Sequence, residues 1–423
     1  MPLIDTMNDT ERRVLEGIDH EGMMEFIETL VSTPSFGGDE TAAQRVVASM
    51  LESLGFSVDA WMMDFDELMR HPEFSMSIPR EEGMGVAGTW GEGERSLMIC
   101  GHIDTVAPGE QEGWDTPPLE ATVVDGRLHG RGTVDMKAGL ACGLYAVKAV
   151  MDAGVKPEGR IIFTSVIGEE DGGCGALATC LRGYRADAGI IMEPSETRIA
   201  PEVAGAMSFR VTVPGRSAHA CVREEGVSAI DNFITLVEGL RELEAERNRD
   251  VDDPLYIRYD TPYALSVGTV HGGEWPGTVP ERVVFEGRLG VKVGENRSEA
   301  RRQLEEKVDA VADGDPWLSV NRPKVEWAGY SFAPSSVELG HPIVEAVAGA
   351  YRDAVGEEPV YEGMTYASDA RLLIDVGGTP TIVFGPGDVR DAHSANESVS
   401  LEDLDRTVRT LALTILRFLG HHG

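Results

Sequence analysis

The strongest constraint on the fold is a regular alternation of short apolar runs with helical stretches, interrupted once in the middle of the chain. Apolar runs of strand length lie at 96–100, 160–167 and 188–192, and a helical stretch covers 136–152. The last part of the chain repeats the pattern, with a predicted helix at 343–355, a strand at 379–384 and a helix at 401–419. This order predicts an α/β fold in which helices cover a mixed sheet.

A further helix is predicted between Asp39, which is placed to cap it, and Gly55, which is placed to end it. Its apolar face is expected to consist of Ala42, Val46, Met50 and Leu54. These residues recur every four positions, as one face of a helix requires.

The middle of the chain has a different predicted order of elements: strand, helix, strand, strand, helix, strand. The strands are predicted at 207–213, 264–271, 282–291 and 324–327, and the helices at 227–247 and 298–312. This βαββαβ order predicts a ferredoxin-like α+β domain inserted into the first one. The predicted catalytic domain therefore consists of residues 1–203 and 332–423, and the inserted domain of residues 204–331.

The charge balance excludes several kinds of partner. The 423 residues include 72 Asp and Glu but only 37 Lys and Arg, for a net charge of −35. Nucleic acid and anionic membranes are therefore not expected partners, because both need a basic surface. Only six of the basic residues are Lys. An acidic, Lys-poor surface indicates either adaptation to high salt or an acidic protein from a GC-rich genome.

The cysteines and the N-terminus predict a soluble cytoplasmic protein. The five cysteines are odd in number and have no CxxC pairing, which favours reduced thiols over disulfides or a Cys-ligated metal. Residues 1–5 lack the basic start and apolar run of a signal peptide. No apolar run approaches the ~20 residues of a membrane span.

Residues of metal-ligand type follow the predicted strands. His102 follows the first apolar run, Glu169 and Glu170 the second, Glu193 the third, and His393 the last. Asp135 begins the helix at 136–152. The carboxyl ends of strands in an open α/β sheet line its binding crevice. We therefore expect these side chains to converge, and together they suit a divalent metal ion.

The chain resembles a family of co-catalytic di-zinc amidohydrolases and exopeptidases. This family includes acetylornithine deacetylase, succinyl-diaminopimelate desuccinylase, aminoacylase and glutamate carboxypeptidase. The matching motifs occur in family order: Gly101–Val106, Gly130–Gly132 with Asp135–Lys137, Gly168–Glu170, Met192–Ser195, Gly215–His219, Ser368–Arg371 and Ala392–Glu397. Each motif alone is modest, but the ordered set is specific.

The resemblance implies a role for each matched residue. Asp135 would bridge two divalent ions, of which zinc is the expected metal and cobalt or manganese are alternatives. His102 and Glu193 would complete one site, and Glu170 and His393 the other. The carboxylate of Asp104 would hold the His102 ring in its ligating tautomer. Glu169 would be the general base that takes a proton from the attacking water and passes it to the departing amine.

The inserted domain is expected, from the same resemblance, to form a homodimer and to act as a lid. His219 would reach the partner's active site and stabilise the oxyanion, and Arg288 would bind a substrate carboxylate. One departure is Gly277, which stands where the family usually has an Asn that contacts substrate. Arg288 also follows Pro280 by two residues fewer than expected, an even shift that keeps its strand face.

The predicted activity is hydrolysis of the amide bond of a small N-acyl amino acid or amine. Acetylornithine-like and succinyl-diaminopimelate-like substrates lead this prediction. The alternatives are a carboxypeptidase or dipeptidase, a formylaminopyrimidine deformylase, for which Gly277 leaves room, and a non-catalytic binding module of the same fold. The complete set of ligand-type residues argues against the last of these.

Overall fold

The computed structural model describes residues 7–422 and divides the chain into two compact units. The first unit runs to Glu202 and also contains Ser336–Glu362 and Ser368–Gly423; the second consists of Val203–Ser335 and Gly363–Ala367. Residues 1–5, on which the prediction about a signal peptide depends, lie outside the described residues. Within residues 7–422, no helix combines the length and the apolarity that a membrane crossing requires.

The main sheet is mixed, which confirms the predicted α/β class. In spatial order its strands are β1 (Ser57–Met62), β2 (Met84–Gly91), β7 (Arg160–Val166), β3 (Ser96–His102), β8 (Ala188–Ile191), β16 (Thr381–Val383), β9 (Ile199–Val203) and β14 (Ser335–Ser336), with β15 (Tyr361–Met364) beside β9. The adjacent strands β7, β3, β8 and β16 are parallel. Strand β2 is antiparallel to β7, and β9 to β16. The four parallel strands therefore end at one edge of the sheet.

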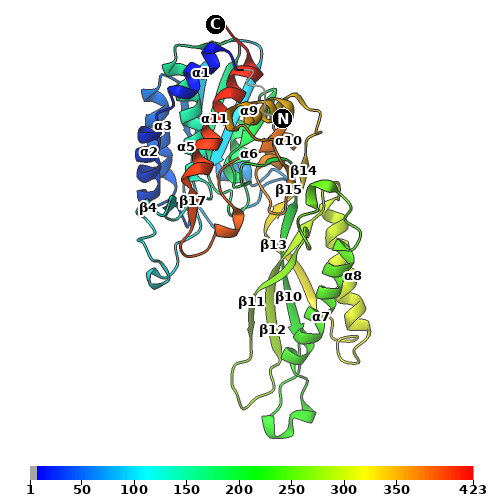
Figure 1. Cartoon of the computed structure of the whole chain (residues 1–423). Helices are drawn as coiled ribbons and strands as arrows, with labels where there is room; N and C mark the ends of the chain where they lie inside the picture. The colour runs from blue at the N-terminus through cyan, green and yellow to red at the C-terminus, as the bar shows by residue number, and fades with distance from the viewer. Residues whose placement is uncertain (1–6, 423) are drawn as a thin grey trace. The chain divides into compact units, whose positions relative to one another are not determined.

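Helices cover this sheet (Figure 1). They are α1 (Asp9–Glu16), α2 (His20–Ser32), α3 (Thr41–Ser53), α4 (Phe65–Leu68), α5 (Lys137–Asp152), α6 (Cys174–Leu181), α9 (Pro342–Val355), α10 (Ala370–Asp375) and α11 (Leu401–Leu419). Helix α5 contacts β3, α2 and α11, and almost all of it is buried. All seven residues of β3 are buried, as a central parallel strand covered on both faces requires.

The predicted face and cap of α3 are wrong. The helix buries Ala43, Val47 and Leu51, one position along from the predicted stripe, which is exposed or half-buried. Two adjacent stripes of this helix are apolar, so the sequence pattern alone does not distinguish them. The side chain of Gln44 donates to the carbonyls of Met84 and Ser165, which orients the helix with the Ala43 stripe inward. The residue before the helix is Glu40, which makes no side-chain cap and pairs with a buried arginine instead.

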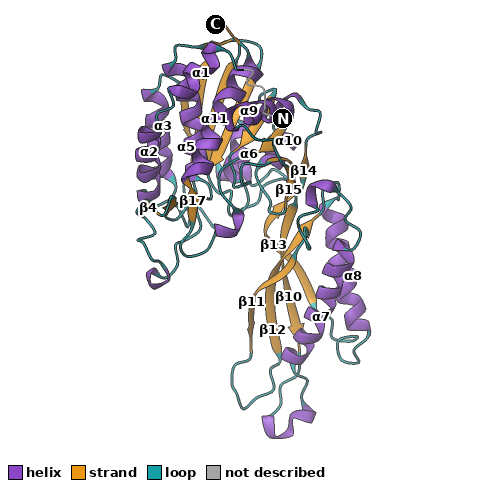
Figure 2. Ribbon diagram, in the orientation of Figure 1, coloured by secondary structure: helices purple, strands orange, loops and turns teal. Residues whose placement is uncertain are grey.

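The second unit consists of one antiparallel sheet with two long helices on one face (Figure 2). Its elements are β10 (Gly205–Pro214), α7 (Ala229–Asn248), β11 (Leu265–Gly272), β12 (Arg282–Val291), α8 (Arg297–Asp313) and β13 (Lys324–Phe332). The strand order in space is β11-β12-β10-β13. Phe209 and Phe285 of the sheet pack with Leu240 of α7 and Leu304 of α8 in one core. The alternating burial along β10 matches the alternating apolar pattern of its sequence.

Two small sheets complete the fold. One has the order β17-β5-β4, formed by Ser398–Ser400, Arg127–His129 and Thr122–Val124, and the other pairs β6 (Lys156–Pro157) with β18 (His421–His422). The pairing of β17 with β5 sets Ser398 opposite His129. It therefore brings the segment before Asp135 beside the segment after His393.

Candidate metal centre

Five ligand-type side chains converge at the carboxyl edge of the parallel strands. His102 is the last residue of β3, Glu170 lies in the turn after β7, and Glu193 lies two residues beyond β8. Asp135 lies just before α5, and the bond between it and Met136 is a cis peptide. His393 lies in the loop between β16 and β17. The five belong to two groups of three that could each hold a metal ion.

The first group consists of His102, Asp135 and Glu193. The Nε2 atom of His102 lies 3.0 Å from Oδ1 of Asp135 and 3.5 Å from Oε1 of Glu193. The ring of His102 is fully buried, and the carboxylate of Glu193 is almost so. One imidazole nitrogen and two carboxylates therefore face a common point.

The second group consists of Asp135, Glu170 and His393. The Nε2 atom of His393 lies 3.3 Å from Oδ2 of Asp135 and 2.9 Å from Oε2 of Glu170. Asp135 thus directs Oδ1 to the first group and Oδ2 to the second. A single carboxylate that serves both groups has the arrangement of a bridging ligand between two cations.

The ring of His102 is oriented by the main chain. Its Nδ1 atom lies 2.9 Å from the carbonyl oxygen of Asp104, whereas Oδ1 of the same residue is 3.6 Å away. A proton on Nδ1 bonded to this carbonyl leaves Nε2 free as a ligand. The Asp104 carboxylate instead accepts the backbone N–H of Glu170 through Oδ2 at 3.1 Å. The closer contact to the His102 ring is therefore the carbonyl of Asp104. A role for the Asp104 carboxylate in holding the ring stays a prediction.

The electrostatics of the cluster favour a bound cation. Burial and the neighbouring Asp135 raise the pKa of Glu170 to about 7. Burial likewise raises the pKa of Glu193 to about 8, although His102 opposes this shift. Hydrogen bonds to Asp135 and Glu170 raise the pKa of His393 to about 10. Crowded, buried carboxylates are unstable in their charged forms alone, and a divalent cation among them removes that cost.

The donor set itself fits such an ion. Each group offers one imidazole nitrogen and two carboxylates, all of which zinc and similar divalent ions accept. Three protein ligands leave a coordination position open for water or substrate, as in catalytic rather than structural sites. The residues present therefore fit a catalytic divalent metal.

Glu169 lies beside this cluster without being part of either group. It lies three residues beyond the end of β7, directly after Gly168, and its side chain is buried. Burial and the nearby charge of Glu193 raise the pKa of Glu169 well above its usual value. A buried carboxyl group with high proton affinity, next to metal ligands, has the properties of a general base.

The two remaining predicted residues lie in the second unit. His219 is exposed, and its Nδ1 atom accepts the backbone N–H of Cys221 at 3.1 Å, so a proton on the ring resides on Nε2. Arg288, on β12, donates from Nη2 to the carbonyl of Thr365 at 3.0 Å. Burial lowers the pKa of Arg288, and within residues 7–422 no carboxylate forms an ion pair with it.

Glu397 lies in the motif 392–397, but the sequence alone predicts no role for it. In the structure its carboxylate is buried against the N–H groups of Val134 and Asp135. The sequence likewise predicts no role for Lys137, which is buried and donates to the carbonyls of Leu30 and Thr33. The position of both residues inside matched motifs was the available signal, but their partners lie far away in the sequence.

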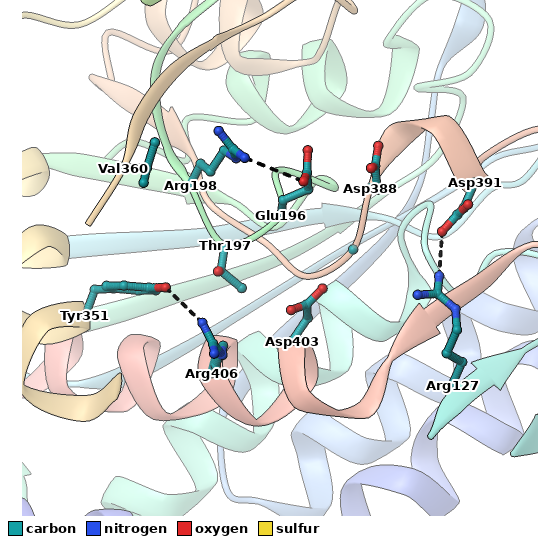
Figure 3. Close-up of a pocket in the computed structure, with 11 residues that line it drawn as sticks. Arg127, Glu196, Thr197, Arg198, Tyr351, Val360, Asp388, Asp391, Asp403 and Arg406 are labelled. Atoms are coloured by element: carbon teal, nitrogen blue, oxygen red, sulfur yellow. Dashed lines mark hydrogen bonds and ion pairs between the residues drawn. The ribbon is translucent and has the colours of Figure 1, made fainter. Parts of the chain in front are cut away.

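A separate polar pocket of about 340 Å³ lies in the first unit. Figure 3 shows three arginines on its wall, of which Arg127 is directed toward Asp391 and Arg406 toward Tyr351. Arg198 pairs with Glu196 on the same wall. Within the described residues, none of the five ligand-type side chains lines this pocket. It is therefore distinct from the candidate metal centre.

Comparison with known proteins decides the family. The model of the Peptidase family M20/M25/M40 matches residues 98–417, a range that contains all five ligand-type residues. The chain belongs to this family. The resemblance to the di-zinc amidohydrolases and exopeptidases is thereby confirmed, and this M20 chain is a metal-dependent hydrolase of amide bonds.

Curated relatives include two enzymes called N-formyl-4-amino-5-aminomethyl-2-methylpyrimidine deformylase. The one from Halalkalibacterium halodurans is 31% identical over 411 residues, which cover 92% of this chain and 93% of the relative. The one from Bacillus subtilis is 31% identical over 408 residues, 91% of each chain. A probable succinyl-diaminopimelate desuccinylase from Staphylococcus epidermidis is 26% identical over 332 residues, 73% of this chain and 80% of the relative.

Solved structures share the fold at lower identity. A dipeptidase from Saccharomyces cerevisiae superposes with a TM-score of 0.77 at 16% identity, over 97% of this chain and 99% of that one. Human carnosine dipeptidase 1 gives a TM-score of 0.76 at 17% identity with the same coverage. These likenesses show the fold and carry no information on substrate.

Proposed function

We propose that this M20 enzyme hydrolyses the amide of a small N-acyl compound at a centre of two divalent ions bridged by Asp135. The observation that carries the proposal is that the two oxygens of Asp135 face two separate groups, each completed by one His and one Glu. Zinc is the expected ion, and cobalt or manganese also suits these ligands. When bound, the ions polarise the amide carbonyl and make water more acidic.

The protein's own residues perform the proton transfers in this proposal. Glu169 accepts a proton from the attacking water and later donates it to the departing amine. Its raised pKa supports the first step, because a carboxylate with a higher pKa is a stronger base. Glu169, His102 and Glu193 are buried, which strengthens the interactions among them by limiting competition from water.

The leading substrate class is a formamide of an aminomethylpyrimidine-type amine. Two relatives named as deformylases of such a compound match more than nine-tenths of this chain at 31% identity. Gly277 supports the same class, because it removes the Asn side chain expected to contact an amino-acid substrate. In the structure Gly277 lies near the Trp275 ring, where an added Cβ would come within 2.9 Å of Nε1.

The second candidate class is an N-acyl amino acid, such as an N-acetyl or N-succinyl compound. Arg288 favours it, because a half-buried guanidinium without a carboxylate partner among the described residues is suited to bind a substrate carboxylate. The probable desuccinylase supports the same class at 26% identity. These two classes differ in one group, since only the second carries an α-carboxylate.

One experiment separates the classes. The wild type and Arg288→Met are assayed on a formylated aminomethylpyrimidine, N-acetylornithine, N-succinyl-diaminopimelate and a dipeptide. If the substrate carries a carboxylate that Arg288 binds, the substitution raises KM by 10-fold or more, the loss of a charge-assisted hydrogen bond at about 1.5–3 kcal/mol. If the formamide is the substrate, it leaves KM unchanged. Arg210→Met is the matched control, because Arg210 lies on the same sheet and pairs with Glu286.

We further propose that the second unit forms a homodimer and supplies His219 to the partner's site. Support comes from exposed apolar side chains on that unit, at Val222, Ile230, Ile234 and Val270. It also comes from the His219 ring, whose Nδ1 accepts a backbone N–H and leaves Nε2–H to donate to an oxyanion. His219→Ala is expected to lower kcat by about 10²–10³-fold, the usual cost of an oxyanion donor. Unchanged kcat, or a monomer by light scattering, would refute this role.

A further inference from the structure

The geometry points to Glu397 as a positioning residue for the metal centre, an inference that rests on the proposed function. We propose that its carboxylate locks the loop that carries Asp135 to the loop that carries His393. In this role Glu397 touches no metal ion. It fixes the relative position of two ligands that come from opposite ends of the first unit's sequence.

The side chain of Glu397 holds the Asp135 loop. Its Oε1 atom accepts the backbone N–H of Val134 at 2.9 Å and that of Asp135 itself at 3.2 Å. The second of these bonds acts on the peptide group of a proposed bridging ligand. The Glu397 main chain adds a third contact, because its carbonyl accepts the N–H of Gly130 at 3.0 Å.

Arg131 links Glu397 to the loop that carries His393. Its Nη1 atom donates to Oε2 of Glu397, and its Nη2 atom donates to the carbonyl of Ser394 at 3.2 Å. Ser394 is the residue directly after His393. The guanidinium also lies over the Trp114 ring, 5.1 Å from its centroid. The Arg131 and Glu397 side chains are 4% and 1% exposed, so their geometry is shielded from water.

The His393 loop needs such support because its backbone is strained. His393 has φ 58° and Asn396 has φ 61°, so two residues that are not glycine adopt the left-handed conformation within four positions. This conformation persists only where surrounding contacts enforce it. Arg131 bonds to the carbonyl of Ser394 between these two positions, and Glu397 directly follows Asn396 in the chain. The ligand position of His393 therefore depends on this pair.

A second pair of residues joins the same two segments and offers a matched control. Arg127 of β5 donates to Asp391, which lies two residues before His393 (Figure 3). The two side chains are 40% and 41% exposed, and their bonds reach Ser398 rather than the ligand peptides. A substitution here breaks a bridge between the segments without touching the backbone of Asp135.

The experiment measures cobalt binding by purified full-length protein, free of other metals. Competition with a chelator gives the affinity, and the visible absorption of bound Co²⁺ reports ligand geometry. Glu397→Gln is expected to lower cobalt affinity 10–100-fold, as loss of a group that orients a ligand usually does, and to change the absorption spectrum. Asp391→Asn is expected to keep both the affinity, within about 2-fold, and the spectrum.

Three outcomes would overturn the inference. First, if Glu397→Gln folds and has the same cobalt affinity and absorption spectrum as Asp391→Asn, Glu397 has no positioning role. If Glu397→Gln does not fold, Arg131→Lys, which keeps the charge but loses the Ser394 contact geometry, must weaken cobalt binding and alter the spectrum; unchanged values refute the inference. A wild type that binds no cobalt refutes the proposed metal centre as well as the role of Glu397. In the first two outcomes the wild type still binds cobalt, so only the role of Glu397 fails.

Discussion

Replacing Glu169 with Gln removes a charge and a proton acceptor while keeping the shape of the side chain. Burial and the nearby charge of Glu193 raise the pKa of Glu169, so its charged form is disfavoured in the folded metal-free protein. A group with a raised folded-state pKa loses its stabilising contribution as pH rises. The neutral Gln is therefore expected to leave the free energy of unfolding unchanged or higher. Stability measured by urea denaturation tests this part directly.

The catalytic loss is expected to be large. General-base catalysis contributes about 10²–10⁴-fold to kcat. At 1.36 kcal/mol for each factor of ten, this range corresponds to about 3–5 kcal/mol of barrier height. Metal content should not change, because within residues 7–422 Glu169 belongs to neither ligand group. The assay pairs kcat on the best amide substrate with metal content measured by mass spectrometry of the same sample.

The neighbouring residue offers the matched comparison. Glu170→Gln makes the same chemical change one position along, but Glu170 lies in the second ligand group at 2.9 Å from His393. We expect it to lose metal as well as activity. If Glu169→Gln loses as much metal as Glu170→Gln, or keeps more than a tenth of the wild-type kcat, the assignment of Glu169 as base rather than ligand is wrong.

Three further predictions concern the bridge, the core and the surface. Asp135→Ala should reduce bound metal at both groups, since each would keep only two ligands; full retention of one ion would contradict a bridge. Arg80→Met should lower the free energy of unfolding in urea by about 3–5 kcal/mol, because it leaves the buried carboxylates of Glu40 and Asp171 without their cation. A loss below ~1 kcal/mol would contradict a stabilising role for these buried ion pairs. Raising KCl from 0.1 to 2 M should raise the unfolding temperature, because salt shortens the range of repulsion from ~10 Å to below ~3 Å in a chain of net charge −35; an unchanged temperature would argue against salt adaptation.

Much of the first unit's architecture follows from apolar patterning. The runs that predicted β3 and β7 are continuous because these central strands are buried on both faces, and continuous runs are easy to find. Parallel pairing then places the residues that follow each strand at one edge. The convergence of His102, Glu170 and Glu193 could therefore be expected from sequence.

What could not be predicted depends on contacts between distant segments. The predicted buried face of α3 is wrong because two neighbouring stripes of the helix are apolar. The hydrogen bonds of Gln44, which orient the helix, reach carbonyls 40 and 121 residues away. The contact of the His102 ring with a carbonyl rather than a carboxylate depends on the path of the main chain at Asp104. Glu397 meets the Asp135 loop across more than 260 residues, which no local spacing reveals.

The most direct test of the central claim is an anomalous difference map from crystals of the zinc-loaded protein, recorded at the zinc absorption edge. The proposal predicts two peaks on either side of Asp135, one among His102, Asp135 and Glu193 and the other among Asp135, Glu170 and His393. A single peak, or two peaks that do not share Asp135, would contradict the bridged metal centre.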